Sequence, residues 1–258
     1  MTFEHITAKA ENGVGILTID RPDVLNALDL HTLHEVERAL EKWRRDEGVR
    51  VVIITGAGEK SFASGADIGE INRRTMMEAL RPNMTVTYRK IELYDKPTIA
   101  AINGYALGGG FELALSCDIR IASDHAKMGL PEASLGIMPG AGGTQRLARI
   151  AGKGKALELI LTGDILTAEQ AEAAGLVSRT VPREHLLETA KMYADKMKAK
   201  APLALRLAKA AVHYGYEMDV DAALYMEKLS QTVLMGSEDK REGTAAFLEK
   251  RKPRFKGR

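Results

Sequence analysis

The chain has 258 residues, of which 45% are hydrophobic and 28% are charged, with 37 Lys and Arg against 35 Asp and Glu. This composition is that of a globular protein and excludes the disordered and fibrous classes, and the formal charge of +2 gives no global electrostatic reason to expect nucleic acid as a partner. The single cysteine, Cys117, excludes an intrachain disulfide framework and a multi-cysteine metal site. We find neither a secretory signal at the N-terminus nor about 20 consecutive apolar residues, so we expect a cytoplasmic protein with no membrane partner.

The first half of the chain alternates between strand-like and helix-like segments. Residues 14–20 and 50–55 are rich in β-branched side chains and bounded by glycine, which predicts strands. Between them, apolar residues recur at helical spacing after Asp29, which suits an N-cap. Residues 98–102 and 118–122 are further predicted strands. Strands that alternate with helices predict an α/β core.

The last third of the chain is predominantly helix-like. Residues 167–170 form a capping-box pattern, Gly175 stands where that helix should stop, and residues 177–181 are the last predicted strand. Four helices are predicted after it, at residues 184–200, 202–214, 219–235 and 237–250. We therefore place an α/β core at residues 1–200 and a helical C-terminal region at residues 201–258.

Three glycine-rich stretches are hard to explain by packing alone: residues 64–67, 103–113 and 131–143. The triple glycine 108–110 precedes a short apolar segment that is a candidate helix. Glycine there permits a positive φ and lets a ligand approach the backbone, while a helix start offers free N–H donors and a positive dipole end. Such a turn suits an oxyanion. The alternative is a tight strand-to-helix turn that binds nothing.

Two glutamates stand in apolar surroundings within these stretches. Glu112 lies between Phe111 and Leu113, and Glu132 follows Pro131. Carboxyl groups in such settings often have raised pKa values, and two of them can form an acid/base pair. Helix periodicity cannot bring together residues so far apart in sequence, so only the fold can do so. Taken singly, each is more simply a surface or helix-start glutamate.

Other candidate sites are weaker. His31 and His34 have one-turn spacing but no evident third metal ligand, and no histidine is placed to activate Cys117, which is more simply a core residue. Residues 140–145 lack the register of a dinucleotide-binding turn. Residues 250–258 are strongly basic, which is typical of a solvated tail or of a contact to phosphates.

Taken together, these stretches resemble the signature segments of the crotonase superfamily, and within it the enoyl-CoA hydratases. The resemblance covers almost the whole chain, and its segments follow in order: residues 21–28, 62–68, 101–110, 131–132, 139–147 and 247–252. It implies the crotonase fold, which is an α/β spiral of ββα units followed by a helical trimerisation region. It also implies a homo-oligomer, either a trimer or a dimer of trimers.

The resemblance also implies the roles of individual residues. The backbone N–H groups of Ala66 and Gly109 would form an oxyanion hole for the thioester carbonyl of an acyl-CoA substrate. Glu112 and Glu132 would hold the reacting water, Glu112 chiefly as base and Glu132 delivering the proton to Cα. The residues implied to bind CoA are Ala63, Ser64, Ala66, Asp67, Ile68, Gly109, Phe247 and Lys250, the last two from a neighbouring subunit. The resemblance implies no metal and no nicotinamide. CoA is part of the substrate and is not counted as a cofactor.

The acid pair favours one reaction within the superfamily. Isomerases, hydrolases and decarboxylases of this superfamily typically change one or both acidic positions, so two glutamates indicate reversible hydration of a trans-2-enoyl-CoA. Residues 71–94 are methionine-rich, and they either line the site of the acyl tail or pack as an ordinary helix. Gly69 stands where close relatives often have a lysine, so a local contact to CoA is in doubt. The alternatives are a branched or carboxylated enoyl-CoA substrate, dehydration of a 3-hydroxyacyl-CoA, and an RNA-binding member of the superfamily.

Overall fold

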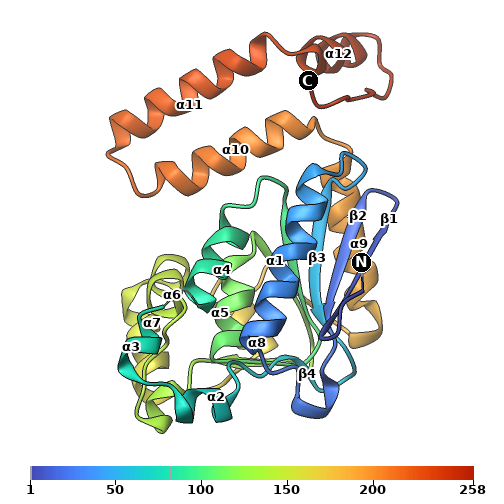
Figure 1. The fold of residues 1–258 in the computed structure, drawn as a ribbon. Coiled ribbons are helices and arrows are strands. Elements are labelled where there is room, and N and C mark those ends of the chain that lie inside the picture. Colours follow the sequence, from blue (N-terminus) through green and yellow to red (C-terminus); the bar gives the residue numbers. More distant parts are fainter. Residues whose placement is uncertain (1, 82) are drawn as a thin grey trace.

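A six-stranded sheet and a smaller four-stranded sheet form the centre of the fold (Figure 1). The computed structural model describes residues 2–81 and 83–258. The larger sheet has the order β1-β2-β3-β5-β7-β10 and is parallel except for the β1–β2 pair. Its strands are β1 (Ile6–Glu11), β2 (Val14–Ile19), β3 (Val51–Gly56), β5 (Thr98–Ile102), β7 (Ile119–Ser123) and β10 (Arg179–Val181). The smaller sheet contains β4 (Ser61–Ala63), β6 (Tyr105–Leu107), β8 (Lys127–Gly129) and β9 (Leu166–Thr167).

The two sheets are built by a repeated unit. Strands β3, β5 and β7 lie in the larger sheet, and the strand that follows each of them lies in the smaller sheet before the chain turns into helix. The predicted spiral of ββα units is therefore confirmed. Its repetition brings the helix starts that follow β4, β6 and β8 to the same side of the smaller sheet, which is how distant glycine-rich stretches come together.

Helices follow the strands and then continue alone to the C-terminus. The core helices are α1 (Leu30–Arg45), α2 (Ile68–Arg73), α3 (Met76–Ala79), α4 (Met84–Glu92), α5 (Gly109–Ser116), α6 (Gly143–Ala151), α7 (Lys153–Thr162), α8 (Ala168–Ala173) and α9 (Leu186–Lys198). The last three are α10 (Pro202–Gly215), α11 (Val220–Met235) and α12 (Glu238–Leu248). Short 3₁₀ turns occupy Pro22–Val24, Glu132–Leu135 and Arg183–His185.

The central strands are buried on both faces, so alternate residues enter two different hydrophobic clusters. On β3, Val52 and Ile54 belong to the larger cluster, which includes α1 and α5, while Val51 and Ile53 pack against α9. This two-sided burial explains why β3 reads as a continuous apolar run rather than as an alternating one.

Several local predictions are confirmed. The strand at Thr98–Ile102 has the predicted limits. The side chain of Asp29 accepts a hydrogen bond from the Thr32 N–H and caps α1, and Thr167 and Gln170 form the predicted capping box of α8. The other predicted strands and helices are present, with ends that coincide or differ by one or two residues.

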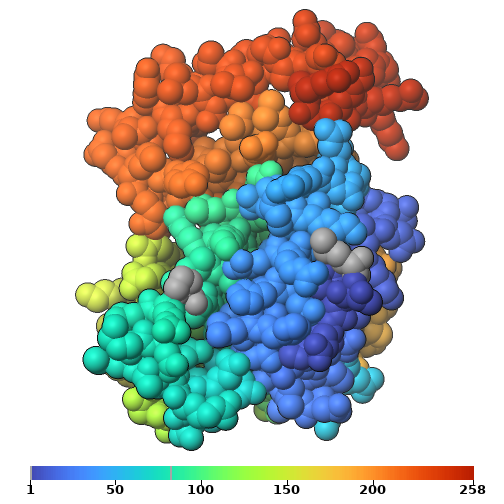
Figure 2. Space-filling view, viewed as in Figure 1, coloured from blue at the N-terminus to red at the C-terminus, as the bar shows by residue number. Residues whose placement is uncertain are grey.

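The last three helices lie apart from the sheets. Helices α10 and α11 run beside each other across one end of the core, coloured orange in Figures 1 and 2. Neither helix contains a buried residue, and large apolar side chains on them are exposed: Val212, Tyr214, Val220, Leu224, Tyr225 and Val233. Across the described ranges, no helix is both long and apolar enough to cross a bilayer.

Candidate active site

A cavity of about 490 Å³ opens where the helices after β4, β6 and β8 begin. Its lining includes backbone from two glycine-rich stretches and both singled-out glutamates: Ser64, Gly65, Ala66, Gly108, Gly109, Glu112 and Glu132. Apolar side chains from α2, α3 and α4 and from the segment after Glu132 complete it: Ile68, Ile71, Met76, Met84, Leu135, Ile137 and Met138. An apolar cavity with a few convergent polar groups is the usual form of a small-molecule site.

Two backbone N–H groups, those of Ala66 and Gly109, lie close together in this cavity. Leu28 N–H bonds the Gly65 carbonyl and Asp67 N–H bonds the Leu28 carbonyl, so the Ala66 N–H faces away from this parallel bridge. Gly109 is the first residue of α5, where N–H groups have no partner within the helix. A Cβ on Gly109 would stand 3.4 Å from the Ala66 nitrogen, so a side chain there would crowd the pair.

The glycines around Gly109 are required by close packing. Gly108 has φ +52°, a conformation that L side chains rarely adopt. A Cβ on Gly110 would stand only 1.9 Å from the Ala63 carbonyl oxygen. The hydroxyl of buried Tyr88 donates to the Gly109 carbonyl at 2.8 Å and supports the first turn of α5. Close packing therefore requires these glycines, as the alternative of a tight strand-to-helix turn predicts. The same packing also brings the N–H groups of Ala66 and Gly109 close together.

Glu112 is 2% exposed, one turn into α5. Its Oε1 accepts hydrogen bonds from Ala141 N–H at 2.8 Å and Gly143 N–H at 2.7 Å. Burial raises the pKa of this carboxyl, while the two N–H donors and the charge of Arg146 oppose the rise. The simpler interpretation of Glu112 as a helix-start residue is confirmed, because it lies in the first turn of α5. Its interpretation as a surface residue is wrong, because it is buried.

Glu132 begins the 3₁₀ turn after β8 and is 9% exposed. Its Oε2 is buried and has no hydrogen-bond partner in the part of the chain that the structure describes. Burial, and secondarily the charge of Glu112, raises the pKa of Glu132 to about 7. The fold thus brings the two glutamates to one cavity, and an unpartnered carboxyl facing it can hold or release a proton near neutral pH.

The predicted CoA-binding residues divide into two groups. Ser64, Ala66, Ile68 and Gly109 line the cavity, whereas Ala63 is fully buried in β4 beside it. The Asp67 side chain accepts from the Glu70 N–H and caps α2. The roles assigned to all of these residues stay predictions.

Phe247 and Lys250 are not near this cavity within one chain. They lie at the end of α12, at the opposite end of the molecule from α2 and α3 (Figure 1). The Phe247 side chain is 83% exposed. If these two residues contact CoA, they must do so in another subunit, as the resemblance implies.

The basic C-terminal segment is folded against α12 rather than extended. Arg251 pairs with Glu242 at 2.7 Å, and Arg258 pairs with Glu238 at 3.4 Å. Asp239 accepts hydrogen bonds from two backbone N–H groups of the same segment. The segment is therefore folded rather than an extended tail, but its basic side chains are exposed to solvent, so the choice between a solvated segment and a contact to phosphates stays a prediction.

Sequence reasoning missed two supports of the site. Arg146 bonds the Ala141 carbonyl and Tyr88 bonds the Gly109 carbonyl, and the sequence predicted neither contact. Arg146 stands in the glycine-rich segment at 139–147, but an arginine in a helix gives no signal of burial. Among residues 2–81 and 83–258, no group of three or more His, Cys, Asp or Glu is placed to hold a metal ion.

Comparisons with known proteins agree with this geometry. A family model described as Enoyl-CoA hydratase/isomerase matches residues 9–258. The chain is 44% identical over 254 residues to a short-chain-enoyl-CoA hydratase of Clostridium acetobutylicum, covering 98% of this chain and 97% of that one. It is 44% identical over 256 residues to a 2,3-dehydroadipyl-CoA hydratase of Escherichia coli, covering 99% and 100%. A solved enoyl-CoA hydratase structure from Geobacillus kaustophilus superposes with a TM-score of 0.95 at 45% identity, covering 99% of both chains.

Proposed function

The chain belongs to the enoyl-CoA hydratase/isomerase family, and we propose that Glu112 and Glu132 add water reversibly across the double bond of a trans-2-enoyl-CoA. The activity is that of an enoyl-CoA hydratase, a hydro-lyase. One observation carries the assignment of residues: two buried glutamates with raised pKa values line the same cavity as two convergent backbone N–H groups. Full-length relatives named as hydratases support the reaction.

In the proposed mechanism, the thioester carbonyl accepts hydrogen bonds from Ala66 N–H and Gly109 N–H. These donors stabilise the negative charge that develops on the carbonyl oxygen as the reaction proceeds through an enolate-like state. Glu112, as carboxylate, takes a proton from water as the water oxygen bonds to Cβ. Glu132, as carboxylic acid, gives its proton to Cα. The two roles suit the two environments, since Glu112 is hydrogen-bonded by two N–H groups and Glu132 is not.

We infer that this chemistry requires no metal or nicotinamide. Hydration changes no oxidation state overall, and the two carboxyl groups and the N–H pair supply the proton transfers and charge stabilisation that it needs. We place the enzyme in the cytoplasm. We also take residues 201–258 as the oligomerisation region of a trimer or a dimer of trimers, because α10 and α11, although they pack on each other, leave large apolar side chains exposed.

Replacing each glutamate by glutamine tests the assignment. Glutamine keeps the shape and removes the titratable group, so Glu112→Gln and Glu132→Gln should each lower kcat on crotonyl-CoA by roughly 100- to 10,000-fold. Exposed Glu169 on α8 supplies the matched control, since Glu169→Gln should leave kcat unchanged. Near-parental turnover by a folded Glu132→Gln variant would contradict the proposal.

One feature of the cavity favours a carboxylated acyl group as a second candidate substrate. Arg74 is the only basic residue in the described lining, and its neighbours there are mainly apolar. Its side chain is 28% exposed, and its ion pair with Glu70 is long, at 3.9 Å. A guanidinium in this setting is free to bind a terminal carboxylate by two parallel hydrogen bonds. A relative of equal identity is named as a 2,3-dehydroadipyl-CoA hydratase.

Two substrates that differ only at the chain end distinguish these candidates. The pair is trans-2-hexenoyl-CoA and 2,3-dehydroadipyl-CoA, whose acyl chains end in a methyl group and a carboxylate respectively. If Arg74 binds the carboxylate, Arg74→Met should lower kcat/KM on the carboxylated ester by roughly 10- to 150-fold, the worth of a hydrogen bond to a charged group. Its activity on hexenoyl-CoA should stay parental. Arg73→Met, at the adjacent exposed residue, is the control; equal losses on both esters would exclude this role for Arg74.

A further inference from the structure

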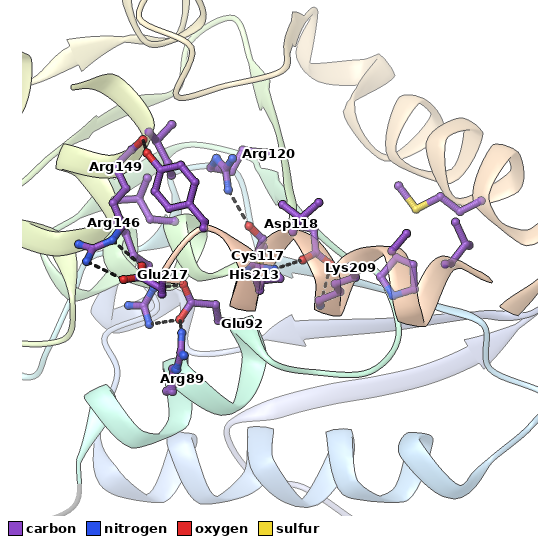
Figure 3. A pocket seen from close by; sticks show the side chains of 18 residues that line it. Arg89, Glu92, Cys117, Asp118, Arg120, Arg146, Arg149, Lys209, His213 and Glu217 are labelled. Carbon is purple, nitrogen blue, oxygen red and sulfur yellow. Dashed lines mark hydrogen bonds and ion pairs between the residues drawn. The ribbon is translucent and has the colours of Figure 1, made fainter. Parts of the chain in front are cut away.

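A second cavity, of about 530 Å³, lies between the core and helix α10 (Figure 3). Charged side chains from α4, α6 and the turn after α10 line it and form ion pairs: Arg89, Glu92, Arg146, Arg149 and Glu217. Arg149 and Glu217 meet at 2.7 Å and join α6 to the end of α10. Arg146 differs from the others because it also bonds Ala141, which lines the active-site cavity. It therefore lies between the two cavities.

Every nitrogen of the Arg146 guanidinium has a partner, although the residue is only 8% exposed. Its Nε and Nη2 donate to the two carboxylate oxygens of Glu92 at 3.2 Å and 3.0 Å, and Arg89 donates to the same carboxylate at 2.7 Å. Its Nη1 donates to the Ala141 carbonyl at 2.8 Å. Burial alone would raise the pKa of Glu92, but these two arginines lower it, so the pair is ionic.

Arg146 contacts the turn at residues 141–143, which also donates two hydrogen bonds to Glu112. Gly142 has φ +102°, and a Cβ on it would stand 2.2 Å from the Arg146 Nη1, so glycine is needed for the guanidinium to lie on the turn. The residues on either side, Ala141 and Gly143, supply the two N–H groups that donate to Glu112. The carbonyl of Ala141 is thus held by Arg146 while its N–H holds the carboxylate of Glu112.

We propose that Arg146 is a positioning residue for the hydration reaction, and that with Glu92 it fixes the turn whose N–H groups orient the Glu112 carboxylate toward water. This inference rests on the proposed function of Glu112. Arg146 touches neither substrate nor water in this scheme. It acts through the backbone of residues 141–143, with Glu92 as its anchor on α4.

The charge of Arg146 has a second effect on the same carboxylate. Burial raises the pKa of Glu112, and the two N–H donors and the Arg146 charge lower it. Loss of Arg146 removes its charge and loosens the donors together, so the pKa of Glu112 should rise. A base whose pKa rises is protonated to higher pH, and the acid limb of the kcat/KM profile moves to higher pH.

The test compares Arg146→Met with Arg149→Met, two arginines one turn apart on α6. Arg149→Met also breaks an ion pair, but with Glu217 in the turn after α10, and leaves residues 141–143 untouched. For Arg146→Met on crotonyl-CoA we expect kcat to fall by about 10- to 100-fold, as small displacements of a catalytic group do. KM should change by less than about twofold, with the acid limb shifted to higher pH. Arg146→Lys keeps the charge but not the paired N–H donors of the guanidinium, so its kcat should lie between those of Arg146→Met and the parent. Arg149→Met should have the kcat and pH profile of the parent.

A parental pH profile and kcat in a folded Arg146→Met variant would overturn the proposal. Should that variant not fold, Glu92→Gln removes the anionic anchor with little change of shape, and it should show a smaller fall in kcat than Arg146→Met. A parental kcat in folded Glu92→Gln would equally overturn the proposal. If the parent enzyme itself failed to hydrate crotonyl-CoA, the proposed function would fail instead, so the two failures are distinguishable.

Discussion

The two active-site glutamates show how backbone environment separates chemically identical side chains. Glu112 receives two N–H bonds on one oxygen, whereas Glu132 has a buried oxygen with no partner in the described chain. Both pKa values are raised by burial, and that of Glu132 reaches about 7. Near neutral pH Glu132 can therefore hold or release a proton, as its proposed role as the acid requires.

The raised pKa of Glu132 predicts a pH-dependent cost to stability. A carboxyl whose folded-state pKa exceeds its unfolded value of 4.5 contributes stability that is complete below that value and is lost as pH rises through about 7. Glutamine cannot ionise, so the stability of Glu132→Gln relative to the parent should increase as the pH rises through about 7. We expect the Tm difference, variant minus parent, to grow by about 2–4 °C between about pH 5 and about pH 8. This corresponds to roughly 1 kcal/mol, which is less than the full pKa shift would give because solvent screens the partly buried carboxyl. Scanning calorimetry at both pH values measures it, and a difference independent of pH would contradict the raised pKa.

At the scale of the element, the start of α5 is the structure on which the proposed polarisation of the thioester depends. Because Gly109 is the first helical residue, proline there removes the N–H without breaking a helical hydrogen bond, while its ring crowds Met84 and Ala66. Gly109→Ala adds a Cβ but keeps the N–H, so it is the matched control for crowding against Met84 and Ala66.

We expect Gly109→Pro to lower kcat on crotonyl-CoA by roughly 100- to 1,000-fold relative to Gly109→Ala, as loss of one oxyanion donor does elsewhere. Steady-state kinetics on both variants, with circular dichroism to verify folding, measure the ratio. Equal kcat values for the two folded variants would show that the carbonyl is not held by the Gly109 N–H.

Helix α4 supplies a test of acyl-chain preference. Met84 begins α4 and lines the cavity, and its Sδ would stand 3.0 Å from a Cβ on Gly109, so it lies at the oxyanion donors. Met84→Ala should therefore enlarge the acyl site and shift the kcat/KM optimum to longer chains across a series from crotonyl-CoA to dodecenoyl-CoA. Met77, which is 64% exposed and outside the lining, gives the control variant Met77→Ala. An unchanged profile in Met84→Ala would indicate ordinary helix packing.

The elements that sequence predicted well are those whose signals are local. Asp29, Thr167 and the period of α1 identify helices because capping and amphipathic spacing act within a few residues. The smaller sheet was missed because β4, β6 and β8 have three residues each, too few for a pattern to appear. The sequence alone also predicted the kinds of group in the site, namely a glycine-rich helix start and two carboxyl groups in apolar surroundings. The convergence of Glu112 with Glu132 depends on the ββα repeat, so it required the family resemblance or the structure.

At the scale of the whole molecule, one chain holds only part of the predicted CoA site. Phe247 and Lys250 lie at the far end of the fold from the cavity (Figure 1), so their predicted contact with the nucleotide needs a neighbouring subunit. Apolar exposure of α10 and α11 is consistent with such an assembly.

Lys250→Ala tests this dependence. Crotonyl-CoA carries the nucleotide and crotonyl-pantetheine does not, so the variant should raise KM by roughly 3- to 10-fold for the CoA ester alone, as loss of about 1 kcal/mol of uniform binding does. Because the contact is remote from the reacting carbons, kcat should change little. Lys252→Ala controls for general loss of positive charge. Identical KM values for Lys250→Ala and the parent on crotonyl-CoA would exclude the contact.

The proposed oxyanion donors belong to the main chain, and this has a consequence for how new activities arise on the scaffold. Because Ala66 and Gly109 would act through their N–H groups, substitution of the neighbouring carboxylates would leave the proposed thioester polarisation in place. A gene library randomised only at codons 112 and 132 would therefore sample many proton-transfer arrangements on a constant, already activated thioester. Such a protein can exchange one reaction for another through few mutations without first losing the ability to activate its substrate.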